Sequence, residues 1–64
     1  MKIKKPYLLD TENMLAWYQT EQEAIECFEA YCSFYTLRIK EFGTRVITVT
    51  NICNNKILFS KSIS

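Results

Sequence analysis

Residues 20–35, TEQEAIECFEAYCSFY, decide the fold of this 64-residue chain. At about 100° per residue, their apolar side chains fall on one side of a helix and their polar side chains on the other. The apolar side consists of Ala24, Phe28, Tyr31, Cys32 and Tyr35, with Ile25 and Cys27 at its edges. The polar side consists of Gln22, Glu23, Glu26, Glu29, Ala30 and Ser33. The sequence therefore predicts one amphipathic helix that packs its apolar side against the rest of the chain.

The start of this helix is marked by a capping box. Thr20 is followed three residues later by Glu23, so the hydroxyl can accept a backbone N–H of the first turn while the carboxylate reaches back. The early glutamates also suit the positive end of the helix dipole. We expect the helix to begin at Thr20.

The residues before the helix favour a β-hairpin over 7–19. Residues 1–6, MKIKKP, form a basic lead-in, and the turn formers at 10–13 separate a short strand at 7–9 from a second at 14–19. Leu15 and Trp17 would then share the core face. The alternative is a helix that starts near residue 10 and runs into the main one, but it would place Leu15 on the polar side and make the Thr20 cap redundant.

After the helix, the hydrophobic period changes from 3.6 to 2. Segments 36–40, 44–52 and 56–61 alternate apolar and polar residues, which predicts a three-stranded meander over 36–62. Three-residue loops ending at Gly43 and Asn55 keep the apolar residues on one face, and both residue types tolerate the left-handed backbone that such loops need. The expected core face is formed by Leu37, Ile39, Ile47, Val49, Ile57 and Phe59, together with Leu15 and Trp17.

These elements predict a single α+β domain over residues 1–64 with the order ββαβββ. One amphipathic helix would pack on one face of a mainly antiparallel sheet. A core of this size yields only about 3–5 kcal/mol, so small domains often add a disulfide, a metal or a second subunit. No internal repeat or linker interrupts the chain.

The composition argues against catalysis. The chain has no histidine and no glycine-rich phosphate loop, and two of its cysteines lie in the middle and at the end of the predicted helix rather than at its N-terminus. We therefore expect no enzyme activity, no cofactor and no metal. A three-thiolate zinc site or a disulfide-linked dimer through Cys27, Cys32 or Cys53 is less favoured than burial of these thiols in a reduced, cytoplasmic protein. No segment approaches the length of a membrane span.

A protein-binding role is better supported, because one helix can cover only one face of the sheet. The other face must meet water or a partner, and apolar residues among its threonines are typical of an association surface. Phe42, at a predicted hairpin tip, is a candidate anchor. We expect a protein partner and a homodimer, with the partner site formed by Arg38, Lys40, Phe42, Val46, Thr48, Ile52, Lys56 and Leu58.

Two alternatives use other residues or another ligand. An RNA or single-stranded DNA binder would use basic residues and a stacking aromatic, namely Lys4, Lys5, Tyr18, Arg38, Lys40, Arg45 and Lys56. The net charge of only +1 weighs against it. A small-nucleotide binder at a dimer interface is a further alternative. In size and composition the chain resembles small phage or mobile-element proteins that inhibit host machinery, which implies an inhibitor of a host or defence factor.

Overall fold

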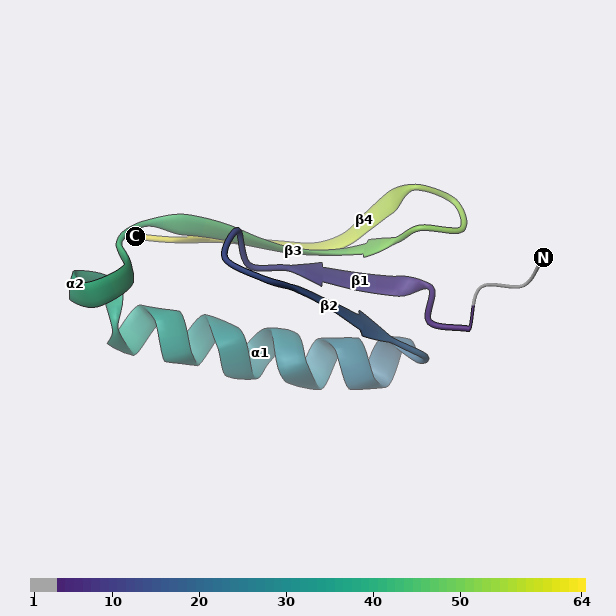
Figure 1. Cartoon of the computed structure of the whole chain (residues 1–64), viewed down its shortest axis with the longest axis horizontal. Coiled ribbons are helices and arrows are strands. Elements are labelled where there is room, and N and C mark those ends of the chain that lie inside the picture. Colours follow the sequence, from purple (N-terminus) through teal and green to yellow (C-terminus); the bar gives the residue numbers. More distant parts are fainter. Residues whose placement is uncertain (1–3) are drawn as a thin grey trace.

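The computed structural model describes residues 4–64, which form a helical layer against one sheet (Figure 1). The elements in chain order are β1 (Tyr7–Asp10), β2 (Leu15–Tyr18), α1 (Glu21–Leu37), α2 (Ile39–Phe42), β3 (Arg45–Asn51) and β4 (Lys56–Ile63). The strands pair antiparallel in the order β2-β1-β3-β4. The predicted α+β class, with one long amphipathic helix on one face of an antiparallel sheet, is confirmed.

Helix α1 begins as the capping box predicts. The Thr20 hydroxyl accepts a hydrogen bond from the backbone N–H of Glu23 at 3.2 Å. The Glu23 carboxylate accepts from that same hydroxyl at 3.2 Å, so it reaches back to the side chain of the cap. These bonds satisfy a backbone donor that the first turn of a helix otherwise leaves free.

The apolar side of α1 forms a core with the sheet in two adjoining clusters. One contains Leu9, Ala24 and Val49, and the other contains Cys32, Tyr35, Ile47 and Ile63. Phe28 and Tyr31 pack against both clusters and join them. The predicted helix stripe and the inward pair Ile47 and Val49 are confirmed.

The strand predicted at 36–40 is wrong. Helix α1 continues to Leu37, and after Arg38 the short helix α2 occupies 39–42. Ile39 and Phe42 are three residues apart, so one helical turn brings both onto one side, where Ile39 packs on the core and Phe42 contacts Tyr35 with ring centroids 5.4 Å apart. A short apolar run of this kind fits both periods, and tertiary packing decided between them. Leu37, expected in the core, is 86% exposed.

The β1–β2 hairpin is present, but β2 presents the opposite face from the one predicted. The register pairs Leu9 with Ala16 and Leu8 with Trp17. Because directly opposed residues share a face, Ala16 joins buried Leu9 beneath the helix, and Leu15 and Trp17 point away from it. Both are exposed instead of buried.

The β3–β4 hairpin also differs from its predicted register. Asn55 has the predicted left-handed backbone, with φ 60°, but the turn holds four residues and pairs Asn51 with Lys56. A bulge then restores the predicted pairing of Val49 with Phe59. As a result Leu58 packs against the core together with Phe59, while Ile57, expected inside, is 64% exposed.

A buried arginine stabilises the end of the molecule at which β3 begins. Arg45 is 8% exposed, and its Nη1 donates to the Thr11 carbonyl at 3.0 Å while Nη2 donates to the Phe42 carbonyl at 2.8 Å. The guanidinium lies over the Tyr35 ring, 4.2 Å from its centroid. One side chain therefore ties the β1–β2 turn, α1 and α2 to the sheet.

Candidate functional site

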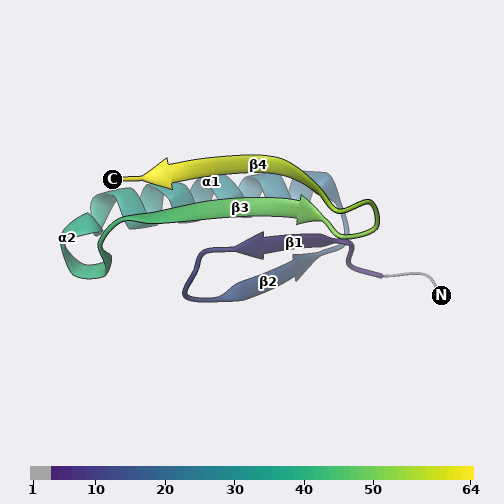
Figure 2. The ribbon, with the colours of Figure 1, turned by 90° about the horizontal axis from the view of Figure 1, so that it is seen from above.

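One face of the sheet is turned away from α1 and has no helix of the described residues packed on it (Figure 1). Figure 2 looks onto this face, with α1 behind the strands. We call it the open face; the register places on it Leu8, Asp10, Leu15, Trp17, Val46, Thr48, Thr50, Ile57, Ser60 and Ser62.

A row of mostly apolar side chains crosses all four strands of the open face. Trp17 on β2 pairs with Leu8 on β1, Leu8 pairs with Thr50 on β3, and Thr50 pairs with Ile57 on β4. Trp17 is 46% exposed and Ile57 is 64% exposed. With strands about 4.8 Å apart, the row is about 14 Å long. We call these four residues the apolar row.

Further apolar side chains lie beside this row. Leu15 and Val46 are exposed on the same face, and Val46 sits opposite Ser62 on β4. The remaining positions carry small polar residues, so the face combines apolar anchors with hydroxyl groups. Exposed apolar residues that adjoin one another mark association surfaces more often than single exposed ones do.

The sheet edges, in contrast, carry features that discourage strand pairing. Edge strand β2 has only four residues. Edge strand β4 is longer, but it contains the bulge and the lysines Lys56 and Lys61. Short edges, bulges and edge lysines are the usual means by which proteins block a further strand. The open face is therefore a better docking surface than either edge.

The predicted partner residues divide into groups in the structure. Val46 and Thr48 lie on the open face, as predicted. Arg38 and Lys40 are exposed at the helical end, because the strand predicted to carry them is absent. Phe42 folds against Phe34, with centroids 5.7 Å apart.

The other three predicted partner residues lie at or beyond the β3–β4 turn. Ile52 is half-buried in the turn, and its N–H donates to the Pro6 carbonyl at 2.9 Å. Lys56 pairs with Asn51 on the helix side of the sheet, and Leu58 packs into the core. The four-residue turn and the bulge account for both displacements. Sequence reasoning assigned Leu15, Trp17 and Ile57 to the core and thereby missed the apolar row.

The residues predicted to bind RNA or single-stranded DNA do not lie along one continuous surface. Lys4, Lys5 and Lys56 lie near the β3–β4 turn, and Arg38 and Lys40 lie at the opposite end of β3, about 20 Å away by the rise of a seven-residue strand (Figure 1). Arg45 is buried, and Tyr18 packs toward the helix. No feature of residues 4–64 favours a continuous path for a phosphate backbone.

The three cysteines lie apart. Cys32 is buried, Cys27 is half-buried and Cys53 is exposed in the β3–β4 turn. Burial raises the pKa of the Cys32 thiol, with Glu29 adding to the effect and Lys61 opposing it. Burial also raises the pKa of Tyr18, assisted by its hydrogen bond with Cys27. A raised thiol pKa means less thiolate, which is the opposite of what a cysteine nucleophile requires.

Among residues 4–64, no three Cys, Asp or Glu side chains gather closely enough to hold a metal ion. No helix in this range is long and apolar enough to cross a membrane. Comparisons with protein-family models, curated proteins and solved structures found no match to this chain.

Proposed function

We propose that this protein is a non-enzymatic binding protein that docks on a protein partner through the open face of its sheet. The observation that carries the proposal is the apolar row, which crosses all four strands and is left uncovered by α1. Trp17 and Ile57 form the two ends of the row. The opposite face of the same sheet packs on α1, which fixes the positions of the strands that carry the row.

Trp17 is the natural anchor of such an interface. Tryptophan is enriched among the few interface residues that dominate binding energy. If 46% of a side chain of about 250 Å² is still exposed, docking can bury about 115 Å² more, which corresponds to about 3 kcal/mol at 25 cal/mol per Å². Leu8 and Thr50 next to it supply a preformed surface, so little chain ordering opposes binding.

The more specific form of the proposal is a steric inhibitor of a host or defence factor. It rests on the size and composition that this chain shares with small phage and mobile-element proteins. A protein that docks through one compact face can inhibit by occupying a surface that its partner needs. Addition of the purified protein to an activity assay of the captured partner tests this form directly.

Affinity capture from the source cells, read by mass spectrometry, tests the docking proposal. Three baits are compared: the wild type, Ile57→Asp and Ala30→Glu. Ile57→Asp places a charge in the apolar row, and Ala30→Glu adds the same charge to the exposed back of α1.

We expect a partner that the wild type and Ala30→Glu capture equally and that Ile57→Asp loses. Both variants should keep the wild-type circular dichroism spectrum, since both replaced side chains are exposed. A partner retained by Ile57→Asp and lost by Ala30→Glu would place the interface on the helical side and refute the proposal.

A further inference from the structure

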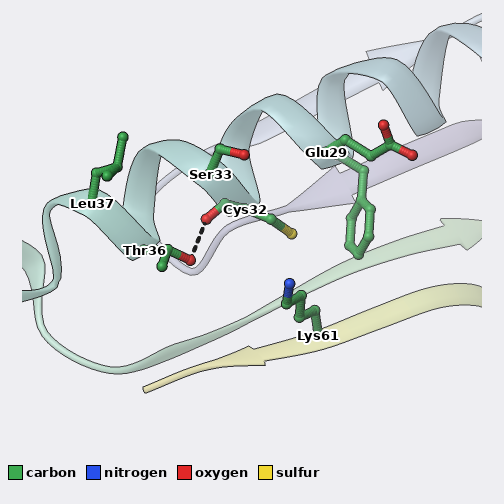
Figure 3. A pocket seen from close by; sticks show the side chains of 7 residues that line it. Glu29, Cys32, Ser33, Thr36, Leu37 and Lys61 are labelled. Atoms are coloured by element: carbon green, nitrogen blue, oxygen red, sulfur yellow. Dashed lines mark hydrogen bonds between the residues drawn. The ribbon is translucent and has the colours of Figure 1, made fainter.

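A groove lies between α1 and the edge strand β4, on the side of the sheet opposite the open face. Its volume is about 570 Å³. Figure 3 shows Cys32 and Thr36 projecting from α1 toward β4, where the Lys61 ammonium points back at the helix. The groove is lined by Phe28, Glu29, Cys32, Ser33, Thr36, Leu37 and Lys61.

An exposed leucine stands at one end of the groove. Leu37, at one end, is 86% exposed, although leucine gains free energy when it leaves water. Glu29, Ser33 and Leu37 follow one another at intervals of four residues, so they form one stripe along α1. The small Ser33 stands at the centre of this stripe, where a second helix could approach closely.

The groove also carries one charge of each sign. Glu29 and Lys61 both line it, and neither takes part in the single ion pair, Arg38 with Glu41, found among residues 4–64. A surface that meets a second copy of itself must be self-complementary. A groove with one carboxylate and one ammonium meets that requirement, because the Glu29 carboxylate of each copy can face the Lys61 ammonium of the other.

We propose that a second copy of this chain occupies the groove, with the two α1 helices antiparallel about a two-fold axis near Ser33. Each Leu37 then enters the groove of the other copy beside Phe28, and each Glu29 faces the partner's Lys61. The two Glu29 residues are kept about 12 Å apart along the helices, eight residues at 1.5 Å each, so they repel only weakly at physiological salt. This homodimer leaves both open faces free, and it does not depend on the proposed function.

Sedimentation equilibrium of the purified chain tests the dimer. We expect the wild type to approach twice its 7.6 kDa mass as the concentration rises. Leu37→Lys should raise the dimer dissociation constant at least tenfold, while a cation still suits the C-terminal end of a helix. The matched control is Leu15→Lys, the same change at an exposed leucine on the open face, and it should dimerise like the wild type.

Several results would overturn the proposal. They are a wild type that stays at 7.6 kDa up to millimolar concentration, a Leu37→Lys variant that dimerises like the wild type, or dissociation by Leu15→Lys. A monomeric wild type that releases a small molecule in native mass spectrometry would assign the groove to that ligand instead. Circular dichroism of each variant checks that it is folded like the wild type.

A mixing experiment separates contact between copies from an effect within one copy. Glu29→Lys gives a groove with two cations, and Lys61→Glu gives a groove with two anions. Each variant should dimerise more weakly than the wild type, while an equimolar mixture should form the heterodimer in preference to both homodimers, as measured by native mass spectrometry at low salt. A statistical mixture of species would contradict the pairing, because a purely internal role for these charges predicts no preference.

Discussion

Replacement of Arg45 by alanine is expected to destabilise the protein far more than replacement of an exposed arginine would. The substitution removes two hydrogen bonds from a charged donor, to the carbonyls of Thr11 and Phe42, and the contact with the Tyr35 ring. Thr11 is fully buried, so its carbonyl is left without a partner. Such losses amount to about 1–3 kcal/mol each and do not add fully, so we expect a net loss of about 3 kcal/mol.

This loss is large against the total. At roughly 0.05–0.15 kcal/mol per residue, a 64-residue chain has a free energy of unfolding of about 3–10 kcal/mol. In a domain of this size each kcal/mol shifts the melting temperature by about 4–8 °C, so Arg45→Ala should lower it by about 12–24 °C. Thermal unfolding followed by circular dichroism measures the shift.

Arg38→Ala is the matched control for this prediction. Arg38 also lies over an aromatic ring, Phe34, at 5.0 Å, and it pairs with Glu41 at 3.6 Å, but its side chain is half exposed. Exposed contacts of these kinds contribute about 1 kcal/mol or less. Equal losses for the two variants would refute the argument that burial and the two carbonyl partners make Arg45 special.

The remaining predictions concern caps, backbone conformation and pH. Thr20→Ala removes the helix cap and should cost about 1 kcal/mol in urea unfolding, and a variant as stable as the wild type would show that the cap contributes nothing. Gly43→Ala should cost about 1–3 kcal/mol through the backbone alone, because φ 77° with ψ −174° is a conformation that is essentially restricted to glycine, while a Cβ there meets nothing within 4 Å; an unchanged stability would speak against that strain. The raised pKa values of Cys32 and Tyr18 mean that the folded state holds both protons more tightly than the unfolded chain. The contribution of Cys32 is therefore lost as the pH rises above the ordinary thiol pKa of 9.0, and that of Tyr18 as it rises above the ordinary phenol pKa of 10.0. Urea unfolding at pH 7 and pH 11 should show this fall, and Tyr18→Phe should reduce it; a fall of the same size in that variant would exclude Tyr18 as a cause.

The parts of the fold that the sequence predicts well are those with one strong, unambiguous pattern. The capping box at Thr20 and the helical stripe that follows extend over several turns, and no other period fits them. The β-branched run of β3 has one buried face, which Ile47 and Val49 define. In these segments local preference and tertiary packing agree.

The errors fall where a short segment fits two patterns. Residues 36–40 satisfy period 2 and one helical turn equally well, and the packing of Ile39 on the core and of Phe42 on Tyr35 decides the outcome. In β2 a one-residue difference in register reverses every side chain. In β4 the four-residue turn displaces only the residues before the bulge, which is why Ile57 and Leu58 exchange faces while Phe59 stays on the core side. The apolar row was missed for this reason, because Trp17 and Ile57, its two ends, read as core residues until the register is known.

The affinity of the captured partner for Trp17→Ala, measured by calorimetry against the wild type, tests the docking proposal most directly. Trp17 is the largest side chain of the apolar row and is already half exposed, so its removal should leave the fold intact. We predict that the dissociation constant rises about 30-fold or more, which corresponds to a loss of about 2 kcal/mol. An unchanged dissociation constant, with the partner still bound, would contradict the assignment of the open face as the binding surface.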